Sequence, residues 1–357
     1  MVGDVLTLEQ FELRESPIPE LKRGQALVRV KLINIHSATR SRMANGTTKL
    51  GETDRTNYAC AEVLQSRDQA FKEGDIIACQ AGWQDYQVLS SADESVGYGP
   101  ASELVKALNG TNSHWNYVFR PAMVKMWSPE ILMDVFGTSG MTAYFGMREC
   151  GPLMPRDAVA VAGATGSVGS IVAQLARSAG CRVVGFAGGE ERCRWLRDVV
   201  GIDGAIDYRA TDFEDRLRGA FPDGIDVYSD GIGGTLTETT VKVMNRNARL
   251  LSYGSAAALY AESLEESRRR PSSLRQAFGV IGNVEQIVKQ RNIKVEAWIV
   301  HAFYHERLKA EDDLSRLLLS GQLKASSNVV EDFEQLPRAI VSLYASARSG
   351  KLQVKFD

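Results

Sequence analysis

The sequence lacks the long apolar run that a membrane-spanning segment requires. No stretch approaches the roughly 20 consecutive apolar residues needed to cross a bilayer. The first residues also do not follow the basic-then-apolar layout of a secretory signal. We therefore expect a cytoplasmic protein that has no membrane partner.

Cysteine and histidine are scarce. The five cysteines are scattered along the chain without a C-x-x-C pair, which argues against a disulfide framework and against a structural zinc site. Of the four histidines, His36 has no cysteine or glutamate at ligand spacing, so we expect no catalytic metal.

The chain also has little net charge. A formal charge of -2 and a pI near 6.2 provide no electrostatic attraction for a polyanion, so no nucleic-acid partner is expected. Hydrophobic residues make up 44% of the chain and charged residues 24%, which is typical of a folded globular protein. A length of 357 residues favours two domains.

Short β-branched segments occupy the N-terminal part of the chain. Residues 26–30, 75–79 and 85–88 are typical of strands separated by turns, which predicts a small antiparallel barrel or sandwich. Two further strands, at 322–330 and 352–356, are expected to return to this domain from the end of the chain.

Strands and helices alternate in the middle of the chain. Residues 157–162 form an apolar run bounded by turn residues, as in a strand that is buried on both faces. Alternation at this length predicts a doubly wound parallel sheet. The expected strands are 157–162, 182–186, 205–208, 225–229 and 248–253, and the expected helices are 129–150, 167–180, 190–200 and 236–244.

A glycine-rich segment follows the first strand of this sheet. Its residues are Gly163, Ala164, Thr165, Gly166, Ser167, Val168 and Gly169. Glycines at such a turn let the main chain approach a pyrophosphate, while the following helix provides unpaired N–H groups and its positive dipole end. Because a strand and a helix flank the segment, we predict a dinucleotide site.

The end of the second strand bears on which dinucleotide fits. An acidic residue there would accept a hydrogen bond from the ribose 2′-hydroxyl and repel a 2′-phosphate, but residues 186–189 contain none. Arg192 and Arg194 follow and offer cations to a phosphate, which favours NADPH. A solvated helix face is the alternative interpretation of these arginines.

Several motifs add a family resemblance. They are Arg-Ser-Arg-Met at 40–43, Gly-Trp-Gln-Asp-Tyr at 82–86, Gly-Met-Thr-Ala-Tyr-Phe-Gly at 140–146, Gly-Ser-Val-Gly at 166–169, Val-Val-Gly at 183–185 and Asp-Gly-Ile-Gly-Gly at 230–234. Together with the order of segments, they resemble the medium-chain dehydrogenase/reductase superfamily. Within it, the chain is similar to the zinc-free branch of prostaglandin reductases, leukotriene B4 12-hydroxydehydrogenase and alkenal double-bond reductases.

The resemblance implies a fold of two domains and an assembly. A GroES-like, mostly-β substrate domain would comprise 1–127 and 321–357, and a Rossmann-type NADPH-binding domain would comprise 128–320. A homodimer is implied as well, and strand edges near 295–300 are where subunits would pair.

The resemblance also implies a reaction and a set of cofactor-binding residues. NADPH would deliver hydride to the β-carbon of an α,β-unsaturated carbonyl in a small-molecule substrate, and the resulting enolate would be protonated at the α-carbon. The protein would orient the reactants and stabilise the developing oxyanion. The implied cofactor-binding residues are Gly163, Thr165, Gly166, Ser167, Val168, Gly169, Gly188, Arg192, Tyr208, Gly231, Ser255, Trp298 and Ile299.

Candidate catalytic and substrate residues are fewer. Tyr260 matches a tyrosine near the cofactor and active site, with an ordinary loop aromatic as the alternative. His36 could donate a proton or a hydrogen bond to the substrate carbonyl, with a buried structural histidine as the alternative. Ala38, Arg40 and Tyr58 are the expected residues of the substrate pocket.

The chain departs from the family pattern at several positions. An aromatic residue expected at the pocket is Ala38, which predicts a wider or differently shaped pocket, and an asparagine expected in the 230–234 turn is Gly231. Two other functions therefore stay open. One is an NADPH quinone oxidoreductase, and the other is a protein that binds NADPH without catalysis.

Overall fold

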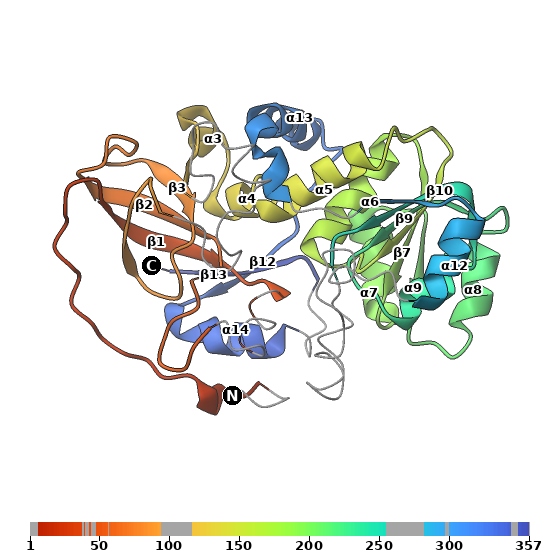
Figure 1. Cartoon of the computed structure of the whole chain (residues 1–357), viewed down its shortest axis with the longest axis horizontal. Coiled ribbons are helices and arrows are strands. Elements are labelled where there is room, and N and C mark those ends of the chain that lie inside the picture. The colour runs from red at the N-terminus through yellow and green to blue at the C-terminus, as the bar shows by residue number, and fades with distance from the viewer. Residues whose placement is uncertain are drawn as a thin grey trace. The chain divides into compact units, whose positions relative to one another are not determined.

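The computed structural model divides into two compact units, which are Met1–Gly137 with His301–His305 and Ser327–Asp357, and Thr138–Val300 with Glu306–Ser326 (Figure 1). We call them the first and second units. The residues that the structure describes are 6–37, 39, 43, 48–55, 57–93, 116–254, 282–296, 300–343 and 349–356. No helix in these ranges is long and apolar enough to cross a membrane.

The first unit is built on a seven-stranded sheet. Its order is β12-β13-β1-β2-β3-β5, and β4 also pairs with β1. The strands are β1 (Ala26–Asn34), β2 (Ala59–Ser66), β3 (Ile76–Cys79), β4 (Tyr86–Leu89), β5 (Tyr117–Val118), β12 (Ser327–Glu331) and β13 (Lys351–Lys355). Short helices α3 (Pro121–Met126), α4 (Pro129–Asp134) and α14 (Leu336–Ser342), with 3-10 turns η1 (Leu8–Gln10) and η5 (Phe333–Gln335), also belong to this unit, and so do residues 301–305 of the 3-10 segment η4 (Val300–Glu306).

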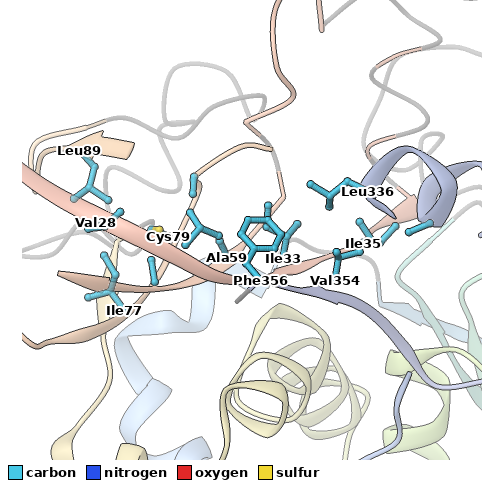
Figure 2. Packing of buried hydrophobic residues seen from close by; sticks show 14 of the residues in the cluster. Val28, Ile33, Ile35, Ala59, Ile77, Cys79, Leu89, Leu336, Val354 and Phe356 are labelled. Atoms are coloured by element: carbon cyan, nitrogen blue, oxygen red, sulfur yellow. The ribbon is translucent and has the colours of Figure 1, made fainter. Parts of the chain in front are cut away.

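Strand β1 organises this sheet. Its buried residues alternate with half-buried ones from Ala26 to Val30, as expected of a strand with one face in the core. It pairs antiparallel with β2, β4 and β13, and Ile33 lies opposite Val354. Figure 2 shows Val28, Ile33 and Val354 in one buried cluster. The predicted return of the last strands to the N-terminal sheet is therefore confirmed.

The second unit contains a six-stranded sheet in the order β11-β10-β9-β6-β7-β8, and every pair in it is parallel. The strands are β6 (Ala158–Ala162), β7 (Arg182–Ala187), β8 (Gly204–Asp207), β9 (Ile225–Asp230), β10 (Met244–Ser252) and β11 (Lys294–Glu296). The helices are α5 (Thr138–Glu149), α6 (Ser167–Ser178), α7 (Glu190–Trp195) with the π-helical turn η2 (Leu196–Val200), α8 (Phe213–Ala220), α9 (Thr235–Val241), α12 (Gly282–Gln290) and α13 (Arg307–Leu319). The predicted doubly wound sheet is confirmed.

Some predicted boundaries are wrong. The helix expected over 129–150 is two helices, α4 and α5, which are separated at Gly137. A Cβ on Gly137 would lie 2.1 Å from the Met133 carbonyl oxygen, so the main chain turns there more tightly than a side chain allows. Strands β2 and β5 and helix α8 were not predicted. β2 (Ala-Cys-Ala-Glu-Val-Leu-Gln-Ser) has only one β-branched residue, so its propensity for strand is weak.

Prediction for the core of the second unit. Phe186 on β7 is fully buried and its ring meets the Phe213 ring edge-on at 5.5 Å. Replacing Phe186 by alanine should lower the free energy of unfolding by about 3–5 kcal/mol, because the apolar contacts are lost and a cavity remains. Urea denaturation measures the change. Leu319→Ala is the control, because Leu319 is 65% exposed. An equal loss of unfolding free energy in both variants would contradict the assignment of Phe186 to the buried core.

Candidate functional site

The order of strands in the second unit creates a reversal point. From β6 the chain adds β7 and β8 on one side, then crosses back and adds β9, β10 and β11 on the other. Ligands of open α/β sheets bind outside the carboxyl ends of the strands at such a reversal. The reversal point here lies between the 163–166 turn after β6 and the 231–234 turn after β9, and we call this place the sheet crevice.

The turn after β6 has the geometry of a phosphate-binding loop. Gly163 adopts a φ of +65°, a conformation that glycine adopts readily, and the Gly166 N–H donates to its carbonyl at 2.9 Å. Helix α6 then begins at Ser167. The first N–H groups of a helix have no intrahelical acceptor, so this end of α6 can bind an anion.

Glycine is required inside this loop because the main chains nearly touch. A Cβ on Gly169 would lie 2.3 Å from the Gly163 carbonyl oxygen, and a Cβ on Gly185 would lie 2.8 Å from the Ala164 Cβ. Real Cβ atoms do not approach so closely. The loop, helix α6 and strand β7 are therefore packed at main-chain distance, as a dinucleotide turn requires.

Gly188 directly follows β7, and the side chains of Tyr208 and Arg209, which follow β8, lie against it. A Cβ on Gly188 would lie 2.8 Å from Arg209 Nε and 3.0 Å from Tyr208 Oη. The Arg209 guanidinium also lies 5.8 Å from the centre of the Tyr208 ring. Two side chains that can bind a phosphate therefore meet where the ribose of a dinucleotide is recognised in such folds.

The acidic residues near this point have other partners. Asp207, the last residue of β8, accepts from the main-chain N–H groups of Gly189 and Arg209, both at 2.9 Å. Glu190, at the start of α7, is paired with Arg197. Arg192 on α7 is half-buried, while Arg194 on the same helix is exposed, so the structure separates two arginines that the sequence presents as equivalent.

A buried carboxylate holds the turn after β9. Asp230 is 1% exposed and accepts from the N–H groups of Ile232 at 2.8 Å and Gly233 at 2.9 Å, and from the Thr237 hydroxyl. Burial raises the pKa of Asp230, and these hydrogen bonds oppose the shift. Ile232 then reaches across to the phosphate loop, because its Cδ1 would lie 3.1 Å from a Cβ on Gly163.

A second polar cluster lies in the first unit where β1 ends. Lys351 is 4% exposed, and its Nζ lies 3.3 Å from His36 Nδ1 and 3.3 Å from the Ile35 carbonyl oxygen. A protonated lysine can only donate. His36 therefore accepts at Nδ1 and, when neutral, carries its hydrogen on Nε2.

Asn57 ties the neighbouring segments together. In the amide orientation that gives both its nitrogen and its oxygen suitable partners, Asn57 donates to the Asn34 carbonyl at 2.9 Å and to the Thr39 hydroxyl oxygen at 2.8 Å. It accepts from Trp83 Nε1 at 2.8 Å. Tyr58 is buried, and its carbonyl accepts from the Asn34 N–H at 3.0 Å. The structure thus places His36 and Tyr58 at the same end of β1.

The predicted site residues divide into those the structure describes and those it does not. The phosphate-loop residues, Gly188, Tyr208 and Gly231 lie around the sheet crevice, and Arg192 lies in the helix that follows Gly188. Residues outside the described ranges are Ala38, Arg40, Ser255, Tyr260, Trp298 and Ile299.

Sequence analysis missed three residues of these clusters. Arg209 could have been noticed as the basic residue directly after Tyr208, and Asp230 as the acid that opens the glycine-rich turn. Lys351 had no local signal, because only the pairing of β13 with β1 brings it to His36.

Two matches to protein families cover separate parts of the chain. Residues 2–96 match the family described as the N-terminal domain of oxidoreductase, and residues 167–279 match the family described as zinc-binding dehydrogenase. Among the described residues, no group of three or more His, Cys, Asp or Glu could hold a metal ion.

Whole-chain relatives agree with these matches. The NADPH-dependent curcumin reductase of Escherichia coli is 26% identical over 97% of this chain and 92% of its own. The Bos taurus prostaglandin reductase 1 is 28% identical over 98% of this chain and 94% of its own. Along its whole length the chain is thus similar to reductases of the medium-chain dehydrogenase/reductase superfamily.

Solved structures of this superfamily share the fold along almost the whole length. CurA from Vibrio vulnificus has a TM-score of 0.80 and 26% identity, over 99% of this chain and 95% of its own. The structure of CurA in complex with NADPH gives a TM-score of 0.79.

Prediction for the buried lysine. Burial lowers the pKa of Lys351 from its ordinary 10.5 to about 8, and Asp134 partly opposes the shift. Between these values the unfolded chain binds more protons than the folded one, so the free energy of unfolding should rise with pH across this interval. Below about pH 8 both states are protonated and this contribution is constant.

Lys351→Met should remove this rise, which amounts to about 3 kcal/mol at most. Urea denaturation of both proteins from pH 7.5 to 10.5 measures the difference, and the changes common to both cancel. Parallel curves for the two proteins would show that the folded state does not lower the pKa of Lys351.

Proposed function

We propose that this protein is an NADPH-dependent reductase of a conjugated C=C bond in a small-molecule substrate. When bound, NADPH supplies a hydride to the β-carbon of an α,β-unsaturated carbonyl. The observation that carries the proposal is a phosphate loop with a basic ribose site, in a chain whose relatives along its whole length are curcumin and prostaglandin reductases.

The described residues around the sheet crevice fit the dinucleotide. The cradle between Gly163 and Gly169, which a Cβ would fill, receives the pyrophosphate at the N-terminus of α6. Tyr208 and Arg209 over Gly188, with Arg192 on α7, bind the 2′-phosphate. Ser255, Trp298, Ile299 and Gly231 belong to the nicotinamide half of the site.

The first unit supplies the substrate side. His36 donates a hydrogen bond from Nε2 to the carbonyl oxygen, or gives that proton to the α-carbon of the enolate while Nδ1 takes a proton from Lys351, and the hydrogen bond from Lys351 to Nδ1 holds the ring in the tautomer that can do so. Tyr260 is a second candidate donor. Ala38, Arg40 and Tyr58 line the pocket.

The domains and the assembly follow the same proposal. Residues 1–127 and 321–357 form the substrate domain, and 128–320 form the cofactor domain. β11, the last strand in its sheet, is where two subunits pair into a homodimer. We place the protein in the cytoplasm.

Prediction for cofactor choice. NADPH should bind more tightly than NADH. Arg192→Ala and Arg209→Ala should each weaken NADPH binding about tenfold and leave NADH binding within about twofold, because each removes a charge-assisted hydrogen bond to the 2′-phosphate. Titration with both nucleotides, followed by nicotinamide fluorescence, measures the affinities.

Arg194→Ala is the matched control, since Arg194 is an exposed arginine on the same helix. It should leave both affinities unchanged. Equal affinities of the wild-type protein for NADPH and NADH would contradict the assignment of the ribose site.

Prediction for the reaction. The wild-type protein should oxidise NADPH in the presence of enones or enals and yield the saturated carbonyl. His36→Gln should lower kcat about 100-fold without changing NADPH affinity, because the variant loses a proton donor. His305→Gln is the control, as His305 is exposed.

Product analysis by mass spectrometry distinguishes the remaining alternatives. Turnover of planar quinones with no reduction of any enone would indicate a quinone oxidoreductase. Tight NADPH binding without oxidation by any acceptor would indicate a non-catalytic binding protein.

A further inference from the structure

The ring of Tyr253 lies directly on the main chain of Gly231. A Cβ on Gly231 would lie 2.6 Å from Tyr253 Cε2, 2.9 Å from its Cζ and 2.9 Å from its hydroxyl oxygen. Gly231 does not have a positive φ, so it is required here by the space the ring takes and not by its backbone conformation. An asparagine at 231, as the family resemblance predicts, would collide with this ring.

Main-chain contacts fix the tyrosine in this place. The Tyr253 N–H donates to the Asp230 carbonyl at 3.0 Å, which continues the pairing of Ser252 with Asp230 between β10 and β9. A Cβ on Gly254 would lie 2.8 Å from the Gly231 carbonyl oxygen. The end of β10 is therefore closed down on the turn after β9, and the ring is directed from β10 toward β9.

This position lies on one side of the sheet crevice. The ribose-recognition residues Gly188, Tyr208 and Arg209 follow β7 and β8, on the other side of the reversal point between β6 and β9. Each half of a doubly wound sheet binds one mononucleotide of a dinucleotide. Tyr253, which follows β10, is consequently on the half that binds the nicotinamide mononucleotide.

The polar end of Tyr253 is its phenol hydroxyl, which is buried. Burial, and then the charge of Asp230, raise the pKa of the Tyr253 phenol, so the hydroxyl keeps its proton. The residue as a whole remains partly exposed. The rest of its side chain is an aromatic ring, which suits contact with another planar ring.

We propose that Tyr253 is a specificity-determining residue of the cofactor site, and that its ring, seated on Gly231, forms the apolar wall against which the nicotinamide half of the dinucleotide packs. The two residues then depend on each other, because only a glycine at 231 leaves room for the Tyr253 ring. The ring occupies the space of the polar asparagine side chain that the family resemblance predicts. The inference rests on the proposed function as far as NADPH binding is concerned.

The affinities for two nucleotides distinguish a role of Tyr253 in binding the nicotinamide half from a general effect of its substitution on folding. NADPH reaches both halves of the site, whereas 2′,5′-ADP carries the 2′-phosphate and adenosine but no nicotinamide. Tyr253→Leu should weaken NADPH binding about tenfold, by loss of the ring contact, and leave 2′,5′-ADP binding within about twofold. Tyr86→Leu is the matched control, since Tyr86 is 39% exposed on β4 and lies outside the proposed site.

Variants at both positions test the coupling. Gly231→Ala displaces the ring and should weaken NADPH binding, while Gly231→Ala combined with Tyr253→Leu should be no weaker than Tyr253→Leu alone. Tyr253→Phe keeps the ring and should retain most of the affinity. Isothermal titration calorimetry with both nucleotides measures all of these.

Three results would overturn the inference. One is a Tyr253→Leu protein that binds NADPH as the wild type does, and another is an equal loss for NADPH and 2′,5′-ADP, which would indicate a purely structural role. The third is a Tyr253→Phe protein as impaired as Tyr253→Leu. Failure of the wild-type protein to bind either nucleotide would instead overturn the proposed function itself, and this inference with it.

Discussion

Contact between main-chain segments at the carboxyl edge of the parallel sheet is the constraint on which the second unit depends. Gly169 lies against the Gly163 carbonyl, and Gly254 lies against the Gly231 carbonyl, at distances that leave no room for a Cβ. These approaches bring the ends of β6, β9 and β10 together around one crevice. A larger side chain at any of them would separate the elements and open the site.

In each unit a buried ionisable group forms hydrogen bonds to the chain segment that directly follows a strand of the sheet. In the second unit Asp230 accepts from two main-chain N–H groups and from Thr237, so the turn after β9 is closed around a carboxylate. In the first unit Lys351 donates to the Ile35 carbonyl and to His36, at the point where β1 ends. Because an unpaired polar group in the interior is costly, each arrangement specifies the path of the chain as it leaves the strand.

The proposed preference for NADPH over NADH depends on which groups the acidic residues near the proposed ribose site bind. Asp207 and Glu190 stand close in sequence to the arginines of the ribose site, and either could repel a phosphate. Asp207 instead accepts from the Gly189 and Arg209 N–H groups, and Glu190 pairs with Arg197. This leaves Arg209 beside Tyr208 over Gly188.

The sequence by itself determined the fold class and the family resemblance, and it predicted the phosphate loop, because these depend on local order. Apolar runs, turn residues and glycine spacing act within a few residues of one another, and the strands 157–162 and 182–186 were predicted almost to their ends. Weakly patterned elements such as β2 and α8 were not, since they form by packing against neighbours that are remote in sequence.

Only the tertiary structure decided which side chains meet. Lys351 reaches His36 because β13 pairs with β1, Arg209 reaches Gly188 because β8 lies beside β7, and Tyr253 covers Gly231 because β10 pairs with β9. The physical reason is that pairing between strands far apart in sequence is set by the whole sheet and not by any local pattern. The local sequence identified some residues of the proposed site, and the pairing of strands brings further side chains into contact with them.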